Sequence, residues 1–128
     1  MGTAIVLITH DLGAVADIAD TVAVLYAGRC IEQGETRAVM RAAQHPYTHG
    51  LMGCTPHLRL GAAADAGTGA LREIPGLVPP LGRRPAICAF ADRCARVDAT
   101  CLDSPQPALA ETGSARAVAC WHPEARAA

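Results

Sequence analysis

An uninterrupted apolar run opens the chain. Residues 4–8 read A-I-V-L-I and are followed by Thr9, His10 and Asp11. A continuous run with several β-branched residues is typical of a parallel strand that is buried on both faces. We therefore expect a strand that ends at His10. Because ligands bind at the carboxyl ends of strands in open α/β sheets, the imidazole of His10 is well placed for chemistry. The simpler alternative is that His10 only ends the strand while Asp11 caps the next helix.

The pattern of apolar and polar residues over about the next forty positions predicts a helix, a hairpin and two further short helices. Asp11 is a favourable N-cap, and the apolar residues that follow it recur three and four apart. Ala27 and Gly28 form a predicted tight turn between two strands, and Gly34 ends the second strand. Pro46 separates the last two helices. The expected elements are a helix over 12–19, strands over 21–26 and 29–33, and helices over 36–43 and 47–54.

Two composition changes divide the chain. Residues 56–72 are rich in glycine and alanine and read as a linker. The prolines between residues 74 and 85 favour an extended chain with few helices. We therefore predict a first unit over 1–55, a linker over 56–72 and a cysteine-rich, mostly irregular domain over 73–128.

Composition narrows the functional classes. The net charge of −1 gives no reason to expect nucleic acid as a partner. There is no apolar stretch near 18 residues and no basic leader before an apolar segment, so we expect neither a membrane span nor an export signal. A cytosolic location follows as an expectation. In that compartment, six cysteines favour metal or cluster ligation over disulfides.

Four cysteines form the second candidate site. Cys88, Cys94, Cys101 and Cys120 have the spacing C-x5-C-x6-C-x18-C, which differs from zinc ribbons and from bacterial ferredoxins. The apolar residues of this proline-broken segment could hardly hold it together unaided, so the thiols indicate a stapled mini-domain. Spacing alone leaves zinc, an iron–sulfur cluster and metal-free thiols open.

Other candidate residues receive lesser roles. Cys30 and Cys54 lie outside the quartet and read as ordinary buried thiols. His122 follows Cys120 by two residues and could replace a ligand, but four sulfurs already complete a set. His45 is expected to pack and form hydrogen bonds within a helical turn.

Several motifs resemble one protein family. The octet A-I-V-L-I-T-H-D and the D-L-G-A-V-A-D-I-A-D that overlaps its end resemble the switch histidine region of ABC-transporter ATPases, and the order of elements extends this resemblance over residues 3–34. H-P-Y-T and I-P-G-L-V-P resemble the subfamily that energises oligopeptide, dipeptide and nickel importers. The run C-A-F-A-D-R-C-A-R-V-D-A-T-C and the later V-A-C-W-H-P resemble its C-terminal oligopeptide-transporter domain.

The resemblance implies an α/β fold: the truncated C-terminal part of a P-loop ATPase core of the ABC type, followed by the small cysteine-rich domain. His10 would contact the γ-phosphate of ATP, with ATP and Mg²⁺ bound only in the complete subunit. Cys88, Cys94, Cys101 and Cys120 would hold a 4Fe–4S cluster, with zinc as the alternative. The implied partners are permease subunits, a second ATP-binding subunit and, indirectly, an extracytoplasmic peptide-binding protein, which places the subunit peripherally on the inner face of the cytoplasmic membrane.

The chain itself lacks the main parts of an ATP site. A phosphate-binding loop needs a lysine, and all eleven basic residues are arginine. Only Gly2 and Thr3 lie between Met1 and the apolar run, which leaves no room for that loop, the family signature or the acidic Mg²⁺-binding strand. We therefore expect the chain alone to be inactive as an ATPase. The alternative is a non-enzymatic interaction module that binds a cluster or zinc. A metal hydrolase that uses His10 and Asp11 would need further ligands that the sequence does not provide.

Overall fold

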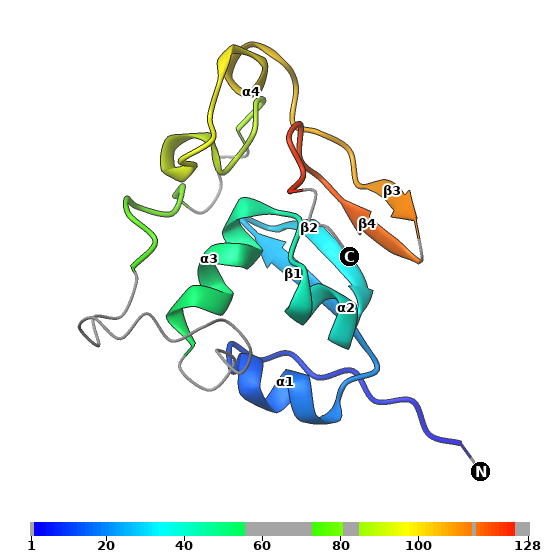
Figure 1. The fold of residues 1–128 in the computed structure, drawn as a ribbon. Helices are drawn as coiled ribbons and strands as arrows, with labels where there is room; N and C mark the ends of the chain where they lie inside the picture. The colour runs from blue at the N-terminus through cyan, green and yellow to red at the C-terminus, as the bar shows by residue number, and fades with distance from the viewer. Residues whose placement is uncertain (1, 56–72, 81–84, 114, 125–128) are drawn as a thin grey trace.

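The fold is built on a four-stranded antiparallel sheet (Figure 1). The computed structural model describes residues 2–55, 73–80, 85–113 and 115–124. The strands are β1 (Thr21–Tyr26), β2 (Arg29–Glu35), β3 (Ala110–Gly113) and β4 (Arg116–Val118). Their order across the sheet is β1-β2-β4-β3, and each neighbouring pair is antiparallel. Strands from the two ends of the sequence therefore share one sheet, and the described residues form a small mixed α/β fold.

The hairpin of β1 and β2 closes through the predicted tight turn. Ala27 and Gly28 have φ angles of 47° and 74°, and two consecutive positive values are what a type I′ turn requires. The β1 strand is confirmed at its predicted bounds, whereas β2 continues to Glu35, two residues beyond the expected end. The hairpin presents buried side chains from both strands to the core.

The described residues also form four short α-helices, and three of them begin at side-chain caps, two of which lie in the first half of the chain. As predicted, Asp11 caps the first helix: its Oδ1 accepts hydrogen bonds from two backbone N–H groups of the first turn, at 2.9 and 3.2 Å. His45 does the same for the third, since its Nδ1 accepts from the N–H of Tyr47 at 3.0 Å. The helices are α1 (Leu12–Ile18), α2 (Thr36–Arg41), α3 (Pro46–Cys54) and α4 (Ala99–Asp103), and a 3-10 turn, η2, covers Ala91–Arg93.

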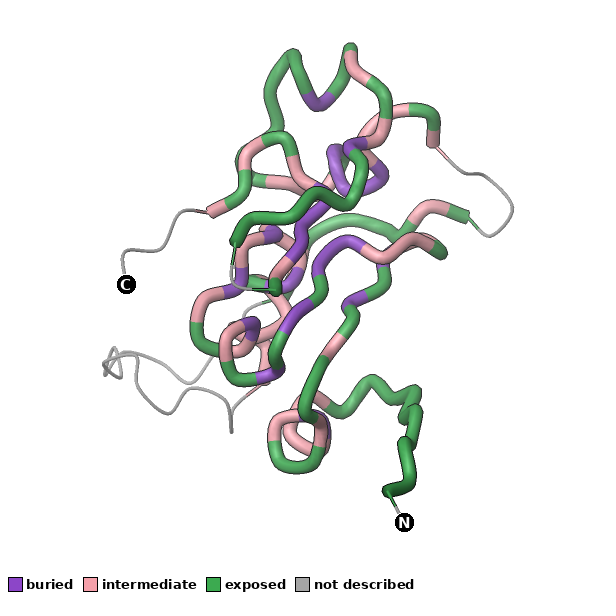
Figure 2. The backbone as a smooth tube through the Cα atoms, turned by 90° about the vertical axis from the view of Figure 1, so that its right-hand side faces the viewer, coloured by how far each residue is buried: buried purple, intermediate pink, exposed green. Residues whose placement is uncertain are grey.

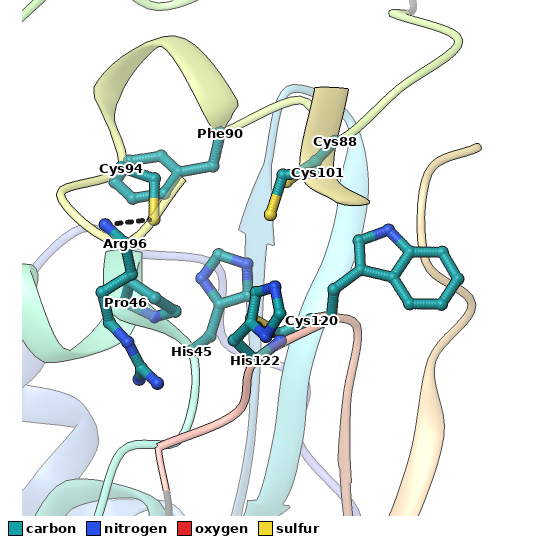
Figure 3. Close-up of a pocket in the computed structure, with 10 residues that line it drawn as sticks. His45, Pro46, Cys88, Phe90, Cys94, Arg96, Cys101, Cys120 and His122 are labelled. Carbon is teal, nitrogen blue, oxygen red and sulfur yellow. Dashed lines mark hydrogen bonds between the residues drawn. The ribbon is translucent and has the colours of Figure 1, made fainter. Parts of the chain in front are cut away.

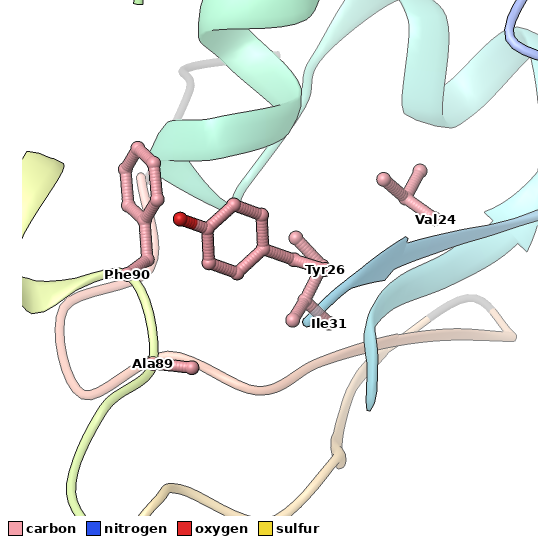
Figure 4. Close-up of a cluster of buried hydrophobic side chains, with 5 residues drawn as sticks. All are labelled: Val24, Tyr26, Ile31, Ala89 and Phe90. Atoms are coloured by element: carbon pink, nitrogen blue, oxygen red, sulfur yellow. The ribbon is translucent and has the colours of Figure 1, made fainter. Parts of the chain in front are cut away.

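The buried core joins the hairpin to the cysteine-rich segment (Figure 4). Val24, Tyr26 and Ile31 come from the hairpin, whereas Ala89 and Phe90 come from the chain just before η2. The rings of Tyr26 and Phe90 meet edge to face with centroids 5.3 Å apart, a favourable aromatic arrangement. The segment that carries the cysteines therefore packs on the hairpin instead of standing apart from it.

A buried ion pair links β2 to β4. Glu32 is completely buried, and its Oε1 lies 3.0 Å from Nη2 of Arg116. The same oxygen accepts a hydrogen bond from the N–H of Gln44 at 2.8 Å, and Oε2 accepts from the N–H of His45 at 3.0 Å. One carboxylate thus connects two strands and the start of α3.

The expected strand over residues 4–8 is wrong. Residues 2–9 have no regular structure, and Ile5 and Ile8 are 85% and 94% exposed, as the green N-terminal tube in Figure 2 shows. A strand needs hydrogen-bonding neighbours, and in the described part of the chain the edge strand β1 pairs only with β2. Without a partner strand, an apolar run has no sheet to join, and α1 has no strand to cover.

Other expectations are met in part. All three predicted helices are present. α1 ends at Ile18, one residue earlier than expected, and α2 ends at Arg41, two residues earlier. The expected linker lies wholly outside the described residues, and the division into two domains stays a prediction. Cys30 and Cys54 are half-buried and not buried as expected, because each lies near the end of its element. Among the described residues, no helix is long and apolar enough to cross a membrane.

Candidate functional site

The four cysteines of the quartet line one pocket, which we call the cysteine pocket (Figure 3). Cys88 lies just before η2, Cys94 directly after it, Cys101 on α4, and Cys120 two residues beyond β4. All are free thiols. The pocket is completed by His45, Pro46, Phe90, Arg96, Trp121 and His122. The four cysteines, which span 33 positions of sequence, thus converge on one site together with residues from the start of α3.

Local hydrogen bonds set the path of the chain around the pocket. The η2 turn is closed by bonds that include the N–H of Ala91 to the carbonyl of Cys88, at 3.1 Å. The side chain of Gln106 accepts from the N–H of Ala89 at 2.7 Å, which holds the loop against the segment after α4. Beyond β4, the N–H of Ala119 donates to the carbonyl of Ile31 at 2.8 Å. This last bond extends the pairing with β2 and delivers the next residue, a cysteine, to the pocket.

Backbone donors point at two of the sulfurs. The N–H of Arg96 lies 3.4 Å from Sγ of Cys94, and the N–H of His122 lies 3.4 Å from Sγ of Cys120. Both bonds span two residues. Hydrogen bonds of this kind stabilise negative charge on sulfur and are found around thiolates that ligate metal clusters.

Burial favours the protonated form of three thiols of the quartet. Burial, together with the smaller effect of the neighbouring thiols, raises the pKa of Cys120 to about 11, and the backbone N–H of His122 opposes the shift. Burial also raises the pKa of Cys88 and of Cys101. Metals bind the thiolate form, so occupation of the pocket must release protons.

An acidic and an imidazole side chain adjoin one of the cysteines. Asp98 caps α4 by accepting from the N–H of Cys101 at 3.1 Å, and its Oδ2 lies 2.8 Å from Nε2 of His122. The Cys101 N–H and the imidazole both lower the pKa of Asp98. Sequence reasoning gave His122 a minor role and missed Asp98, although the D-x-x-C spacing at a helix start would have signalled it.

His45, which lines the pocket, and Glu32, which accepts a hydrogen bond from the N–H of His45, are buried polar residues. Burial lowers the pKa of His45 to about 4, so the imidazole is neutral and serves as a hydrogen-bond acceptor at the start of α3. Glu32 was also missed by sequence reasoning. A carboxylate that follows Ile31 on a half-buried strand is the available signal, since such a residue needs a partner.

The structure keeps His10 apart from the cysteines. His10 is exposed and lies in a bend just before α1, and α1 and α4 lie at opposite ends of the molecule in Figure 1. The two sites predicted from sequence are therefore separate in space, and the role of His10 stays a prediction.

Comparison with known proteins identifies close sequence relatives. Residues 31–101 match the family described as the oligopeptide/dipeptide transporter, C-terminal region. A probable peptide ABC transporter ATP-binding protein of Sinorhizobium fredii is 43% identical over 122 residues, which cover 94% of this chain and 34% of that protein. A probable D,D-dipeptide transport ATP-binding protein of Escherichia coli is 40% identical over 96% of the chain and 35% of its own length. A dipeptide transport ATP-binding protein of Bacillus subtilis is 41% identical over 96% of the chain and 35% of its own length. The chain thus spans about a third of the length of these relatives.

Proposed function

This chain belongs to the family of the oligopeptide/dipeptide transporter C-terminal region, and from that premise we propose that it acts as the C-terminal part of an ATP-binding subunit of a peptide importer. The observation that carries the proposal is the 39–43% identity to peptide and dipeptide transport ATP-binding proteins over nearly the whole chain. The complete subunit would couple ATP hydrolysis to import and would lie on the inner face of the cytoplasmic membrane. Its partners would be permease subunits, a second ATP-binding subunit and, indirectly, a peptide-binding protein outside the membrane.

In this proposal His10 contacts the γ-phosphate of ATP in the complete subunit. Its position just before the N-terminus of α1, exposed and without a structural role in the core, supports a function outside this part of the fold. Phosphoryl transfer depends on positioning and on charge stabilisation by a phosphate loop and Mg²⁺. We expect no ATP turnover by the chain alone, because it contains no lysine for that loop.

A chimera tests the role of His10. We would join this chain to the preceding two thirds of the Bacillus subtilis relative and measure ATP binding and turnover. His10→Ala should lower turnover by about a hundredfold, as expected for the loss of one group that stabilises a transition state, with little change in ATP affinity. His49→Ala, at another exposed histidine, is the matched control. Equal losses of binding and turnover in His10→Ala would indicate a structural histidine.

We further propose that the quartet holds a 4Fe–4S cluster. Four thiols converge on one pocket, and backbone N–H groups point at two of the sulfurs, so the donor set fits such a group. Zinc bound by four thiolates at about 2.3 Å would draw the sulfurs to about 3.8 Å from one another. Among the described residues, no three of these sulfurs lie within 4.8 Å of each other. The wider spacing favours a cluster, in which each thiolate binds a different iron.

The proposed role of the cluster is structural. Metal-binding free energy at such a site is also folding free energy, and the quartet ties η2, α4 and the end of β4 to one point. When bound, the cluster supplies four metal–thiolate bonds to a segment with few apolar residues of its own. The chain's contribution is to place the sulfurs and to direct N–H groups at them.

Anaerobic purification tests the cluster. The protein should be brown, with a broad absorption band in the violet that bleaches in air. Each single Cys→Ser change in the quartet should abolish the colour, whereas Cys30→Ser and Cys54→Ser should not. A colourless protein with one zinc held by the same four cysteines would contradict the iron assignment. A folded, metal-free protein whose quartet is freely alkylated would contradict any metal.

A further inference from the structure

Three ligand atoms of different chemical types gather at one edge of the cysteine pocket. A carboxylate oxygen of Asp98, the sulfur of Cys101 and an imidazole nitrogen of His122 all lie within 4.8 Å of one another. Cys101 is almost fully buried, at 6% exposure, and its sulfur points toward the side of the pocket where His122 lies (Figure 3). Nitrogen, sulfur and oxygen at such separations form the kind of ligand set that zinc accepts.

The contact between Asp98 and His122 is short but poorly aligned for a hydrogen bond. Their Oδ2 and Nε2 atoms are 2.8 Å apart, yet Nε2 is a buried atom without a hydrogen-bond partner of acceptable geometry among the described residues. A buried polar atom in that state is uncommon and calls for a specific partner. Nitrogen and oxygen ligands of a tetrahedral zinc ion, each bound at about 2.0 Å, lie about 3.3 Å apart. A small opening of this contact would therefore let both atoms face one ion.

The other groups around these atoms prepare the three side chains for an ion. Oδ1 of Asp98 is occupied by the N–H of Cys101 at 3.1 Å, which fixes the carboxylate and leaves Oδ2 for another ligand. The helical turn places Asp98 and Cys101, three positions apart, on the same face. The backbone bond between His122 and the Cys120 sulfur positions the imidazole. The set is therefore organised before any ion binds.

We propose that Asp98, Cys101 and His122 form a mononuclear site for a zinc-like divalent ion, with a fourth position taken by water. Binding replaces the sulfhydryl proton of Cys101, which passes to solvent, by a metal–sulfur bond. This site differs from a four-sulfur site because it uses only one thiol of the quartet. The site shares Cys101 with the proposed cluster, so the ion and the cluster cannot be bound at the same time. Only this competition rests on the proposed function; the site itself does not.

Cobalt titration of the cluster-free full chain tests the site, because tetrahedral Co²⁺ reports its ligands through visible absorption. We expect one equivalent of Co²⁺ to bind, with a charge-transfer band from a single thiolate, and Zn²⁺ to displace it. Asp98→Asn, Cys101→Ser and His122→Gln should each weaken Co²⁺ binding by at least about tenfold. Asp98→Asn keeps the helix cap, since asparagine caps as well as aspartate, so circular dichroism should be unchanged.

Matched controls separate this site from the quartet. Asp103→Asn changes an exposed carboxylate on the same helix, and His49→Gln changes an exposed histidine. Both variants should leave the affinity for Co²⁺ unchanged. Cys88→Ser and Cys94→Ser should change it by less than about threefold. The proposal is overturned if Co²⁺ does not bind, or if binding needs all four cysteines and tolerates His122→Gln.

Cluster assembly on the same variants distinguishes failure of this proposal from failure of the proposed function. Asp98→Asn and His122→Gln should still acquire the brown colour after anaerobic reconstitution, because neither residue belongs to the quartet. Added Zn²⁺ should slow that reconstitution in the unaltered chain and not in His122→Gln. Equal inhibition by Zn²⁺ in both proteins would place the zinc on the quartet and contradict the site.

Discussion

The buried carboxylate of Glu32 should be the most sensitive single position in the sheet. Glu32→Gln keeps the size of the side chain but removes its charge and turns one acceptor oxygen into an NH₂ group. The native oxygens accept from Arg116 and from the N–H groups of Gln44 and His45. The best orientation of glutamine keeps its oxygen toward Arg116 and Gln44, and its NH₂ then opposes the N–H of His45.

The cost can be estimated from these contacts. Breaking a buried ion pair by removing one partner costs about 3–5 kcal/mol, and a buried N–H left without an acceptor costs about 1–3 kcal/mol. The contributions overlap, because both reflect desolvation of the same donors, so we expect a loss of about 4 kcal/mol. Small domains are stabilised by only about 5–15 kcal/mol in total. Glu32→Gln should therefore remove much of the stability of the fold.

Urea unfolding measures this loss. For a slope of about 2 kcal/mol per molar urea, the midpoint should fall by roughly 2 M. Glu35→Gln makes the same chemical change at an exposed position on the same strand and should shift the midpoint by less than about 0.3 M, since surface changes cost little.

A double-mutant cycle isolates the ion pair. Arg116→Met should cost less than Glu32→Gln, because Glu32 keeps its two backbone donors, and the double variant should cost less than the sum of the two. If Glu32→Gln were no more destabilising than Glu35→Gln, or if the two changes were additive, the reasoning would be refuted.

Two further predictions concern the same region. Because burial holds the pKa of His45 at about 4 and an unfolded histidine titrates near 6.5, the unfolded chain binds a proton that the folded chain excludes. Stability should then fall by about 3 kcal/mol as the pH drops from about 6.5 to 4. His45→Asn retains a capping acceptor and should flatten that decline, as urea midpoints at pH 7 and pH 4.5 can show; the same decline in both proteins contradicts the assignment. Gly34→Ala would place a Cβ 2.8 Å from Cγ of Arg116, which pushes Arg116 away from Glu32 and should cost about 1–3 kcal/mol. Gly2→Ala meets no atom within 4 Å and is the control, and an unchanged midpoint for Gly34→Ala would argue against the close approach.

Local signals predict local structure in this chain. The Ala27–Gly28 turn and the Asp11 cap were predictable because the residues that form them are neighbours in sequence. The strand expected over residues 4–8 is wrong for the opposite reason, since its existence depends on partners that the run itself does not specify. Strand β4 was not predicted either. It has three residues, and its pairing with β2 joins positions about 84 apart, as does the bond from Arg116 to Glu32.

The same distinction explains what could be predicted about the site. The four cysteines were identifiable because thiols are rare and chemically distinct, and their convergence on one pocket follows from no local pattern. Glu32 and Asp98 were missed because a charged residue in sequence is usually a solvated one, and His122 was given little weight because four sulfurs already complete a ligand set. Their importance lies in burial or in a partner's position, and both are properties of the fold.

The pocket depends on the sheet as much as on the cysteine segment. Cys88, Cys94 and Cys101 lie within fourteen residues and are positioned by η2 and α4, whereas Cys120 reaches them only because β4 pairs with β2. That pairing is held by the Glu32–Arg116 contact and by the bond from Ala119 to Ile31. A metal in the pocket therefore adds a second connection between segments that the sheet already joins. By linkage, whatever stabilises the pairing of β4 must tighten metal binding, and a bound metal must stabilise that pairing by the same free energy.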